Sequence, residues 1–208
     1  MKLHYFPHSP NTRKVLTVVY HLGLDIDLEL VDLFQGAQMG PEYVGLNPNH
    51  MTPTLTDGDF VLWESNAIMQ YLAAQKPGNE LWPSDARTQA DICRWQCWQL
   101  AHWGHACQPI IWERMVKPML GQGDPDAQIV SEAEERFHRF AAVLNGCLTE
   151  RPWLVGKSAT LADFAVAADL MYKDAAQLPV GSYSAIQRWY DSVEKVAAWQ
   201  QAAPPAMG

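Results

Sequence analysis

Three short segments hold side chains that could do chemistry or bind a charged ligand, and the first contains Ser9 and Asn11. Both residues stand where a short β-prone run gives way to a helical pattern. A hydroxyl at a helix N-terminus lies among free N–H groups that favour negative charge. Without a paired base it is a poor nucleophile, but it can donate to an anion such as a thiolate, whose pKa must fall from about 8.5 to be ionised at neutral pH. The alternative is that Ser9 or Asn11 only caps the helix.

The second segment places Thr52 and Pro53 directly before a predicted strand. Proline cannot donate to a strand ladder, so its position at the strand entry is notable. If the Thr52–Pro53 bond is cis, the backbone of Thr52 can offer its N–H and C=O to a peptide-like ligand that pairs as an added strand. An ordinary trans proline at the start of a strand is the alternative.

The third segment places Glu64 and Ser65 between a strand and a helix. Ser65 and the neighbouring N–H groups could hold a carboxylate, and Glu64 could accept from an ammonium group. Together they suit the free amino-acid end of a ligand. The alternative is that Ser65 is a simple N-cap of the helix that follows.

The elements that position these segments alternate between strand and helix over the first 76 residues. Strands are predicted at 2–6 and 25–34, the second half-buried because Ile26, Leu28 and Leu30 alternate with acidic residues. A helix is predicted at 11–22, irregular structure with a helical turn at 35–50, and a hairpin around Asp57-Gly58. A further helix starts near Ser65. The order β-α-β, loop, β-β-α resembles a thioredoxin-like layer.

After a proline-containing linker at 77–85, only helical patterns remain, at about 86–117, 126–149, 160–176 and 183–201. The first of these is expected to kink at Pro109. We therefore predict an α/β domain over 1–76, followed by an all-helical bundle domain over 86–208.

Composition and charge exclude several classes of function. The net charge of −8 makes nucleic acid and anionic membrane surfaces poor partners. No apolar run approaches the roughly 20 residues that span a bilayer, and the N-terminus lacks the apolar stretch of a signal peptide. The four cysteines form no CxxC pair, which is typical of a reduced, cytoplasmic protein.

Together these segments resemble the glutathione transferase superfamily. The family pattern NPxxxxPxLxDGxxxLxESxAIxxYL is matched by NPNHMTPTLTDGDFVLWESNAIMQYL at 47–72. Thr160 and Asp163 are similar to the family's helix-capping box, which is structural. The chain departs from the beta-class pattern, which has a cysteine in the first helix, and from the SSCS run of the zeta class. The resemblance thus argues against mixed-disulfide and isomerase mechanisms.

The resemblance implies a glutathione site in the N-terminal domain. Ser9 would stabilise the thiolate, with Asn11 as a second candidate because SPN is similar to the TPN of nu-type bacterial members. Thr52, before Pro53, would pair with the cysteinyl part, and Glu64 and Ser65 would hold the γ-glutamyl end. Met51 stands where the family often has a lysine or glutamine for the glycyl carboxylate, so His50 or Gln38 is expected to substitute.

A hydrophobic co-substrate is expected between the domains. The residues predicted to line its pocket are Tyr5, Phe6, His102, Trp103, Ala106, Cys107 and Ile110. The alternative is that the tryptophans at 95, 98 and 103 are mostly core. His102 with His105 and Cys93 with Cys97 have metal-ligand spacing, but no third and fourth ligands are evident, so we predict no metal.

The resulting prediction is a cytoplasmic, homodimeric glutathione transferase that activates the thiolate for attack on a hydrophobic electrophile. Glutathione is then a co-substrate, and no nucleic acid or membrane partner is expected. A glutathione-dependent disulfide reductase or peroxidase is one alternative. A non-catalytic binding protein with the same fold is another.

Overall fold

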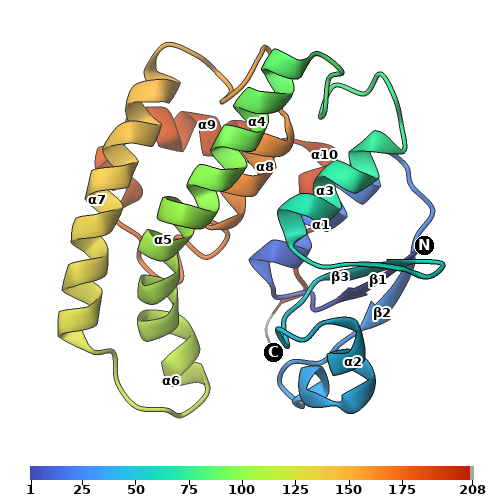
Figure 1. Cartoon of the computed structure of the whole chain (residues 1–208). Coiled ribbons are helices and arrows are strands. Elements are labelled where there is room, and N and C mark those ends of the chain that lie inside the picture. Colours follow the sequence, from blue (N-terminus) through green and yellow to red (C-terminus); the bar gives the residue numbers. More distant parts are fainter. Residues whose placement is uncertain (207–208) are drawn as a thin grey trace. The chain divides into compact units, whose positions relative to one another are not determined.

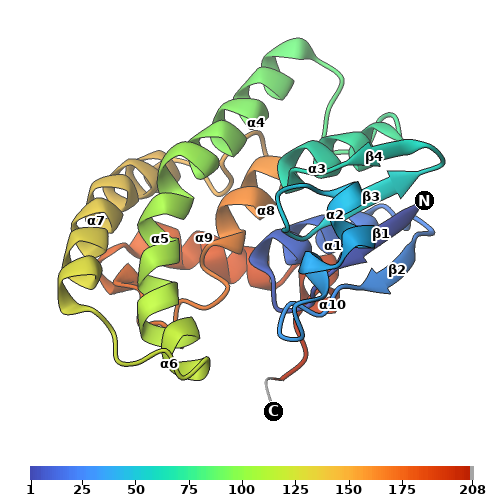
Figure 2. The same ribbon diagram turned by 60° about the horizontal axis from the view of Figure 1, so that its bottom comes forward.

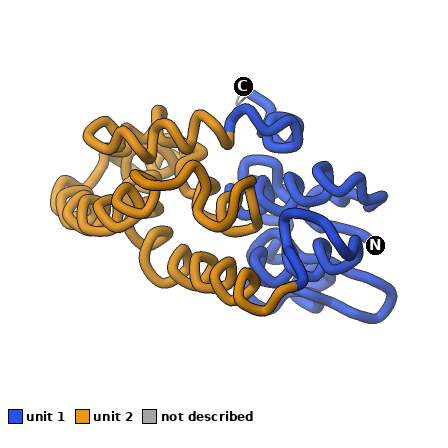
Figure 3. The backbone as a smooth tube through the Cα atoms, turned by 90° about the horizontal axis from the view of Figure 1, so that it is seen from above, with its two compact units in different colours: residues 1–84, 194–208 blue, residues 85–193 orange. Residues whose placement is uncertain are grey.

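The computed structural model describes residues 1–206 and divides the chain into two compact units (Figure 1, Figure 3). Unit 1 comprises Met1–Ser84 together with the C-terminal stretch from Glu194 onward, and unit 2 comprises Asp85–Val193. This division differs at the C-terminus from the prediction of one helical domain over 86–208.

Unit 1 is built on a four-stranded sheet with the order β2-β1-β3-β4. The strands are β1 (Lys2–Tyr5), β2 (Asp27–Leu30), β3 (Thr54–Asp57) and β4 (Phe60–Leu62). β1 pairs in parallel with β2 and antiparallel with β3, and the predicted hairpin joins β3 to β4. The β2 strand was expected to be half-buried, which is wrong. It lies at the sheet edge, where Leu28 and Leu30 are exposed.

Helices α1 (Pro10–His21) and α3 (Ser65–Ala74) pack against each other, and the short η1 (Ala37–Met39) and α2 (Pro41–Leu46) fill the region predicted to be irregular (Figure 2). Ser9 caps α1 by accepting from the Thr12 N–H, and Gly23, at a φ of 58°, follows its end. Side chains with no exposed surface, Leu3, Val15, Leu55 and Ile68 among them, form the core. These elements fix both helix N-termini that carry predicted site residues.

Helix α10 (Ala197–Gln201) joins unit 1 because it packs on α1. The Arg13 guanidinium lies 4.0 Å over the Trp199 ring, and its Nη2 donates to the Trp199 carbonyl at 3.3 Å. A cation over an indole face is a favourable contact, stronger when it is shielded from water. The predicted helix over 183–201 is therefore two helices, α9 (Ser184–Glu194) and α10, in different units.

Unit 2 is helical. The predicted helix over 86–117 runs through α4 (Ala86–Trp98), η2 (Gln99–Trp103), α5 (Gly104–Ile111) and η3 (Trp112–Val116), followed by α6 (Lys117–Met119). Both η2 and η3 are π-helical stretches, and Pro109 lies inside α5 between them. The remaining elements are α7 (Ala127–Thr149), α8 (Leu161–Ala168), η4 (Val180–Ser182) and α9. The predicted helix over 160–176 thus ends early, at Ala168.

The core of unit 2 is organised around the predicted capping box at the start of α8, which is confirmed. Asp163 has no exposed surface and accepts from Leu154 N, Thr160 N, Thr160 Oγ1 and Trp189 Nε1 at 2.9–3.1 Å. Burial raises the pKa of Asp163 to about 6, although these hydrogen bonds oppose the rise.

No helix within residues 1–206 combines the length and the apolar character needed to cross a membrane.

Candidate functional site

At the N-terminus of α1, the helix cap does not use the hydroxyl hydrogen of Ser9. The Ser9 Oγ accepts from the Thr12 N–H at 3.4 Å, so the cap uses the oxygen as an acceptor. The hydroxyl hydrogen can still donate to a ligand. Ser9 is half-buried. Capping the helix and donating to an anion are therefore compatible roles for this side chain.

Asn11, one position into α1, links this helix to the start of α3. Its Oδ1 accepts from the Ser65 Oγ at 3.2 Å. Because the acceptor end of the amide is turned toward Ser65, the two N–H groups of Nδ2 point elsewhere and can donate to an anion. The hydrogen bond orients both residues, which are 54 positions apart in the sequence.

The peptide bond between Thr52 and Pro53 is cis, as the strand-pairing hypothesis required. Both residues are buried directly before β3. The Thr52 Oγ1 is buried and has no hydrogen-bond partner among the described residues. Buried polar atoms are normally satisfied, so an unpartnered one beside an open site points to a ligand or water.

Glu64 precedes α3 with a φ of 71° and a ψ of 104°, a conformation that is rare for residues other than glycine. It is the N-cap of α3 by backbone position, and its carboxylate makes no capping hydrogen bond. Ser65 is the first helical residue and donates to Asn11. The alternative of Ser65 as a simple N-cap is therefore wrong, and the Glu64 carboxylate remains available. Strained backbone of this kind concentrates at functional sites.

One cavity of about 60 Å³ collects five of the predicted residues. Its lining comprises Asn11, Asn47, Asn49, Met51, Thr52, Pro53, Trp63, Glu64 and Ser65. A cavity needs about 10–15 Å³ of probe volume to hold one water, so this one has room for a carboxylate or ammonium group. The cavity offers an exposed carboxylate, hydroxyl and amide groups, and the N-terminus of α3, all of which suit an amino-acid end.

Tyr43 and Asn47 hold the loop that precedes the cis peptide bond, and the sequence pattern did not single them out for this task. The Tyr43 hydroxyl donates to the Met51 carbonyl at 2.5 Å and lies 2.9 Å from the Thr54 Oγ1. The Asn47 Nδ2 donates to the same two oxygens, at 2.9 and 3.0 Å. Burial raises the pKa of Tyr43, so the phenol stays protonated and remains a donor. The NP motif at Asn47 was the only sequence signal for this network.

His50 and Gln38, the predicted substitutes for a glycyl-carboxylate ligand, lie beside each other. The His50 Nδ1 is 3.3 Å from the Gln38 carbonyl oxygen, and the Gln38 Oε1 is buried without a partner among the described residues. Neither lines the 60 Å³ cavity, whereas Met51 does.

One of the two predicted co-substrate residues of unit 1, Phe6, belongs to an aromatic cluster. Phe6 is nearly buried and contacts His8 and Phe34 edge-on, with ring centroids 5.5 and 5.0 Å apart. Phe34 is half exposed, and Tyr5 is half-buried. Unit 1 thus offers an apolar aromatic surface at Phe34, which the sequence did not single out.

The predicted co-substrate residues of unit 2 are mostly core. Trp103, Ala106, Cys107 and Ile110 have no exposed surface, and the Trp103 Nε1 donates to the Val166 carbonyl at 3.2 Å. These four side chains therefore support the core alternative. The last three belong to α5, which packs on α7.

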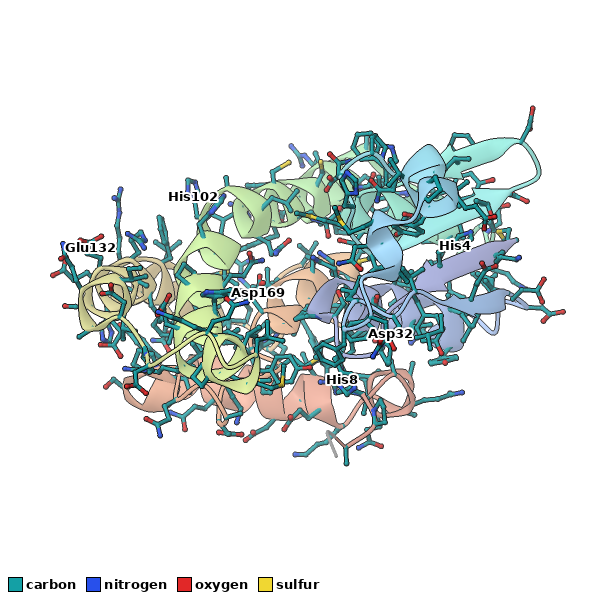
Figure 4. The ribbon with its side chains drawn as sticks, turned by 90° about the horizontal axis from the view of Figure 1, so that it is seen from below. His4, His8, Asp32, His102, Glu132 and Asp169 are labelled. Carbon is teal, nitrogen blue, oxygen red and sulfur yellow. The ribbon has the colours of Figure 1, made fainter. Side chains whose placement is uncertain are left out.

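His102 is the exception in this set. Its side chain, labelled in Figure 4, is exposed. Its ring stacks on Phe140, with centroids 4.9 Å apart.

Comparisons with known proteins agree with this geometry. The chain matches the family described as "Glutathione S-transferase, N-terminal domain" over residues 8–75, and "Glutathione S-transferase, C-terminal domain" over 106–196. It is 36% identical over 165 residues to glutathione S-transferase 3 of Zea mays, covering 78% of this chain and 73% of the relative.

Two solved structures are similar over nearly the whole chain. The first is glutathione transferase F7 of Populus trichocarpa, at 28% identity and a TM-score of 0.87, with 97% of this chain and 96% of that chain covered. The second is a glutathione-bound theta-class enzyme of Xanthomonas axonopodis pv. citri, at 26% identity and a TM-score of 0.88, with 100% and 98% covered.

Proposed function

The chain belongs to the glutathione S-transferase family, and we propose that it activates the thiol of glutathione in unit 1 for transfer to a hydrophobic electrophile. The observation that carries the proposal is the cavity that gathers Asn11, Thr52, Glu64 and Ser65 beside the cis peptide bond. These residues come from α1, from the loop before β3 and from the start of α3.

The γ-glutamyl end of glutathione is assigned to the start of α3. Its α-carboxylate would accept from the first backbone N–H groups of the helix, that of Ser65 among them, while the Glu64 carboxylate accepts from the α-ammonium. The structure around Glu64 supports this assignment, because the carboxylate makes no capping hydrogen bond to α3. The cavity volume suits this end group.

The cysteinyl part is assigned to the backbone of Thr52. An extended peptide can add to this backbone as a short strand, with one N–H and one C=O pairing on each side. Tyr43 and Asn47 support the assignment because both donate to the Met51 carbonyl and so fix the peptide plane that leads into Thr52. They act as positioning residues.

Thiol activation is assigned to the N-terminus of α1. The Ser9 hydroxyl and the Asn11 amide each retain a donor for the sulfur, and the helix N-terminus favours the thiolate over the thiol. The thiolate then attacks the electrophilic carbon, forming the S–C bond as the leaving group departs with its electron pair. The protein contributes a lowered thiol pKa and proximity of the two substrates.

The remaining assignments concern the glycyl carboxylate of glutathione and the electrophile. Gln38 or His50 would meet the glycyl carboxylate, and Tyr5, Phe6 and His102 remain candidates for contact with the electrophile. A cytoplasmic homodimer is part of the proposal, and a light-scattering mass near the 23.4 kDa of one chain would contradict the dimer.

The test compares three substrates: an aromatic halide, 2-hydroxyethyl disulfide and an organic peroxide. We expect glutathione to bind in calorimetry and the halide to be conjugated fastest. Faster turnover of the disulfide or the peroxide would move the assignment to a glutathione-dependent reductase or peroxidase. No glutathione binding would contradict all three activities and favour a non-catalytic relative.

Two substitutions locate the activating group. Ser9→Ala and Asn11→Ala each remove one donor, and losing one preorganised donor lowers kcat by roughly 10²-fold. Thr56→Ser is the matched control, since this half-buried residue of β3 lies outside the cavity lining. If Ser9→Ala leaves kcat unchanged while Asn11→Ala loses activity, the role belongs to Asn11 alone.

A further inference from the structure

Helix α4 carries two cysteines that the proposed glutathione chemistry does not use. Cys93 and Cys97 stand one helical turn apart, and their Sγ atoms are 4.0 Å apart. Residues at i and i+4 share one face of a helix. Cys97 is exposed and Cys93 is half-buried, and both are free thiols. The pair is therefore preorganised and reachable from solvent.

The separation of the two sulfurs matches two ligands on a single thiophilic atom. Zn–S bonds of about 2.3 Å in tetrahedral geometry place two sulfur ligands roughly 3.8 Å apart. A structural zinc site nevertheless takes four protein ligands. Within residues 1–206, no group of three or more His, Cys, Asp or Glu side chains is arranged to hold a metal ion. The pair therefore suits an atom that has a high affinity for sulfur and forms only two bonds to the protein.

A monosubstituted trivalent arsenical meets that requirement, because its arsenic already carries one carbon and forms two further bonds to sulfur. We propose that Cys93 and Cys97 form a dithiol site that captures such arsenicals as a cyclic dithioarsenite on the face of α4. Each new As–S bond replaces one S–H bond, and the oxygen of the arsenic oxide leaves as water with the two protons. Arsenic stays trivalent, and no oxidant or reductant is needed.

The protonation of Cys93 agrees with this balance. Burial, together with the adjacent Cys97 thiol, raises the pKa of Cys93. Cys93 therefore still carries its proton before the reaction, and this proton leaves with the departing water as the As–S bond forms.

The other two cysteines provide internal contrasts. Cys107 has no exposed surface, so an arsenical cannot reach it in the folded chain. Cys147 on α7 is half-buried. A lone thiol forms one As–S bond and lacks the chelate advantage of a second linked group, which is worth roughly 10²-fold or more in affinity.

The experiment titrates phenylarsine oxide into the fully reduced full-length protein and follows adducts by intact mass. We expect one tight equivalent per chain with the loss of one water, resistant to millimolar glutathione but removed by a small dithiol. Cys93→Ser and Cys97→Ser should each weaken capture at least 10²-fold. Cys147→Ser, the matched control, should leave it unchanged.

Two results would overturn the dithiol site. One is that Cys93→Ser or Cys97→Ser binds phenylarsine oxide as tightly as the wild-type protein does. The other is that glutathione alone removes the adduct. The proposal stands apart from the glutathione chemistry, because conjugation by both serine variants should remain at the wild-type rate. If the wild-type protein captures the arsenical but conjugates no electrophile, the proposed function is contradicted and the dithiol site still holds.

Discussion

Polar groups at the starts of secondary-structure elements are in opposite states in the two units. In unit 2, the four lone-pair sites of Asp163 are filled by four donors from the same unit. In unit 1, the Thr52 Oγ1 has no partner among the described residues, and the Glu64 carboxylate does not cap its helix. A saturated polar group stabilises the fold, whereas an unsaturated one beside a cavity is available to a ligand.

The largest expected effect is in unit 2, at the fully hydrogen-bonded carboxylate of Asp163. Asp163→Ala leaves several donors buried and unpaired, including the Trp189 indole N–H. An unsatisfied buried donor costs about 1–3 kcal/mol, so the free energy of unfolding should fall by at least ~3 kcal/mol. Denaturant unfolding measures the loss. Asp174→Ala is the control, because this carboxylate is exposed and its substitution should stay within about 0.5 kcal/mol of wild type.

The next prediction concerns pH. Burial raises the pKa of Asp163 to about 6, above the ordinary value of 3.8, so the folded state holds this proton more tightly than the unfolded chain does. The contribution of this group to stability is therefore fully present below pH 4 and decreases as the pH rises through 6, by about 3 kcal/mol in total. Unfolding free energies of wild type and Asp163→Asn should be compared over pH 4–7. A wild-type advantage that grows with rising pH would contradict this sign.

A smaller effect is expected in unit 1, at the loop that leads into Thr52. Tyr43→Phe removes one donor to the Met51 carbonyl but leaves the Asn47 donor in place. One hydrogen bond is worth about 1 kcal/mol, so KM for glutathione should rise by roughly 3–10-fold with kcat unchanged. Tyr71→Phe is the matched control, because its hydroxyl donates to Asp57 within the hairpin. A lower kcat at constant KM would show that Tyr43 acts elsewhere than on the binding loop.

Local patterns in the sequence predicted several turns and helix starts in both units. The Asp57-Gly58 hairpin and the helix starts at Ser9 and Thr160 depend on residues a few positions apart, and each lies where it was predicted. The sequence left the Thr52–Pro53 bond open between cis and trans, and the bond is cis.

Long-range packing was harder to predict. The contact of Arg13 with Trp199 spans 186 positions, so the sequence carried no local sign that α10 belongs to unit 1. Trp103 and Cys107 were predicted at a ligand wall from helical spacing. Spacing defines a helix face but does not show what covers it.

The measurement that tests thiol activation most directly is the pKa of glutathione bound to the protein, followed by the ultraviolet absorbance of the thiolate as the pH is raised. In wild type we expect the bound thiol to titrate one to two units below its free value of about 8.5. Ser9→Ala or Asn11→Ala should return it toward that value, each lost unit corresponding to about 1.4 kcal/mol of thiolate stabilisation. A bound thiol that titrates at or above the free value in wild type would contradict activation at the N-terminus of α1.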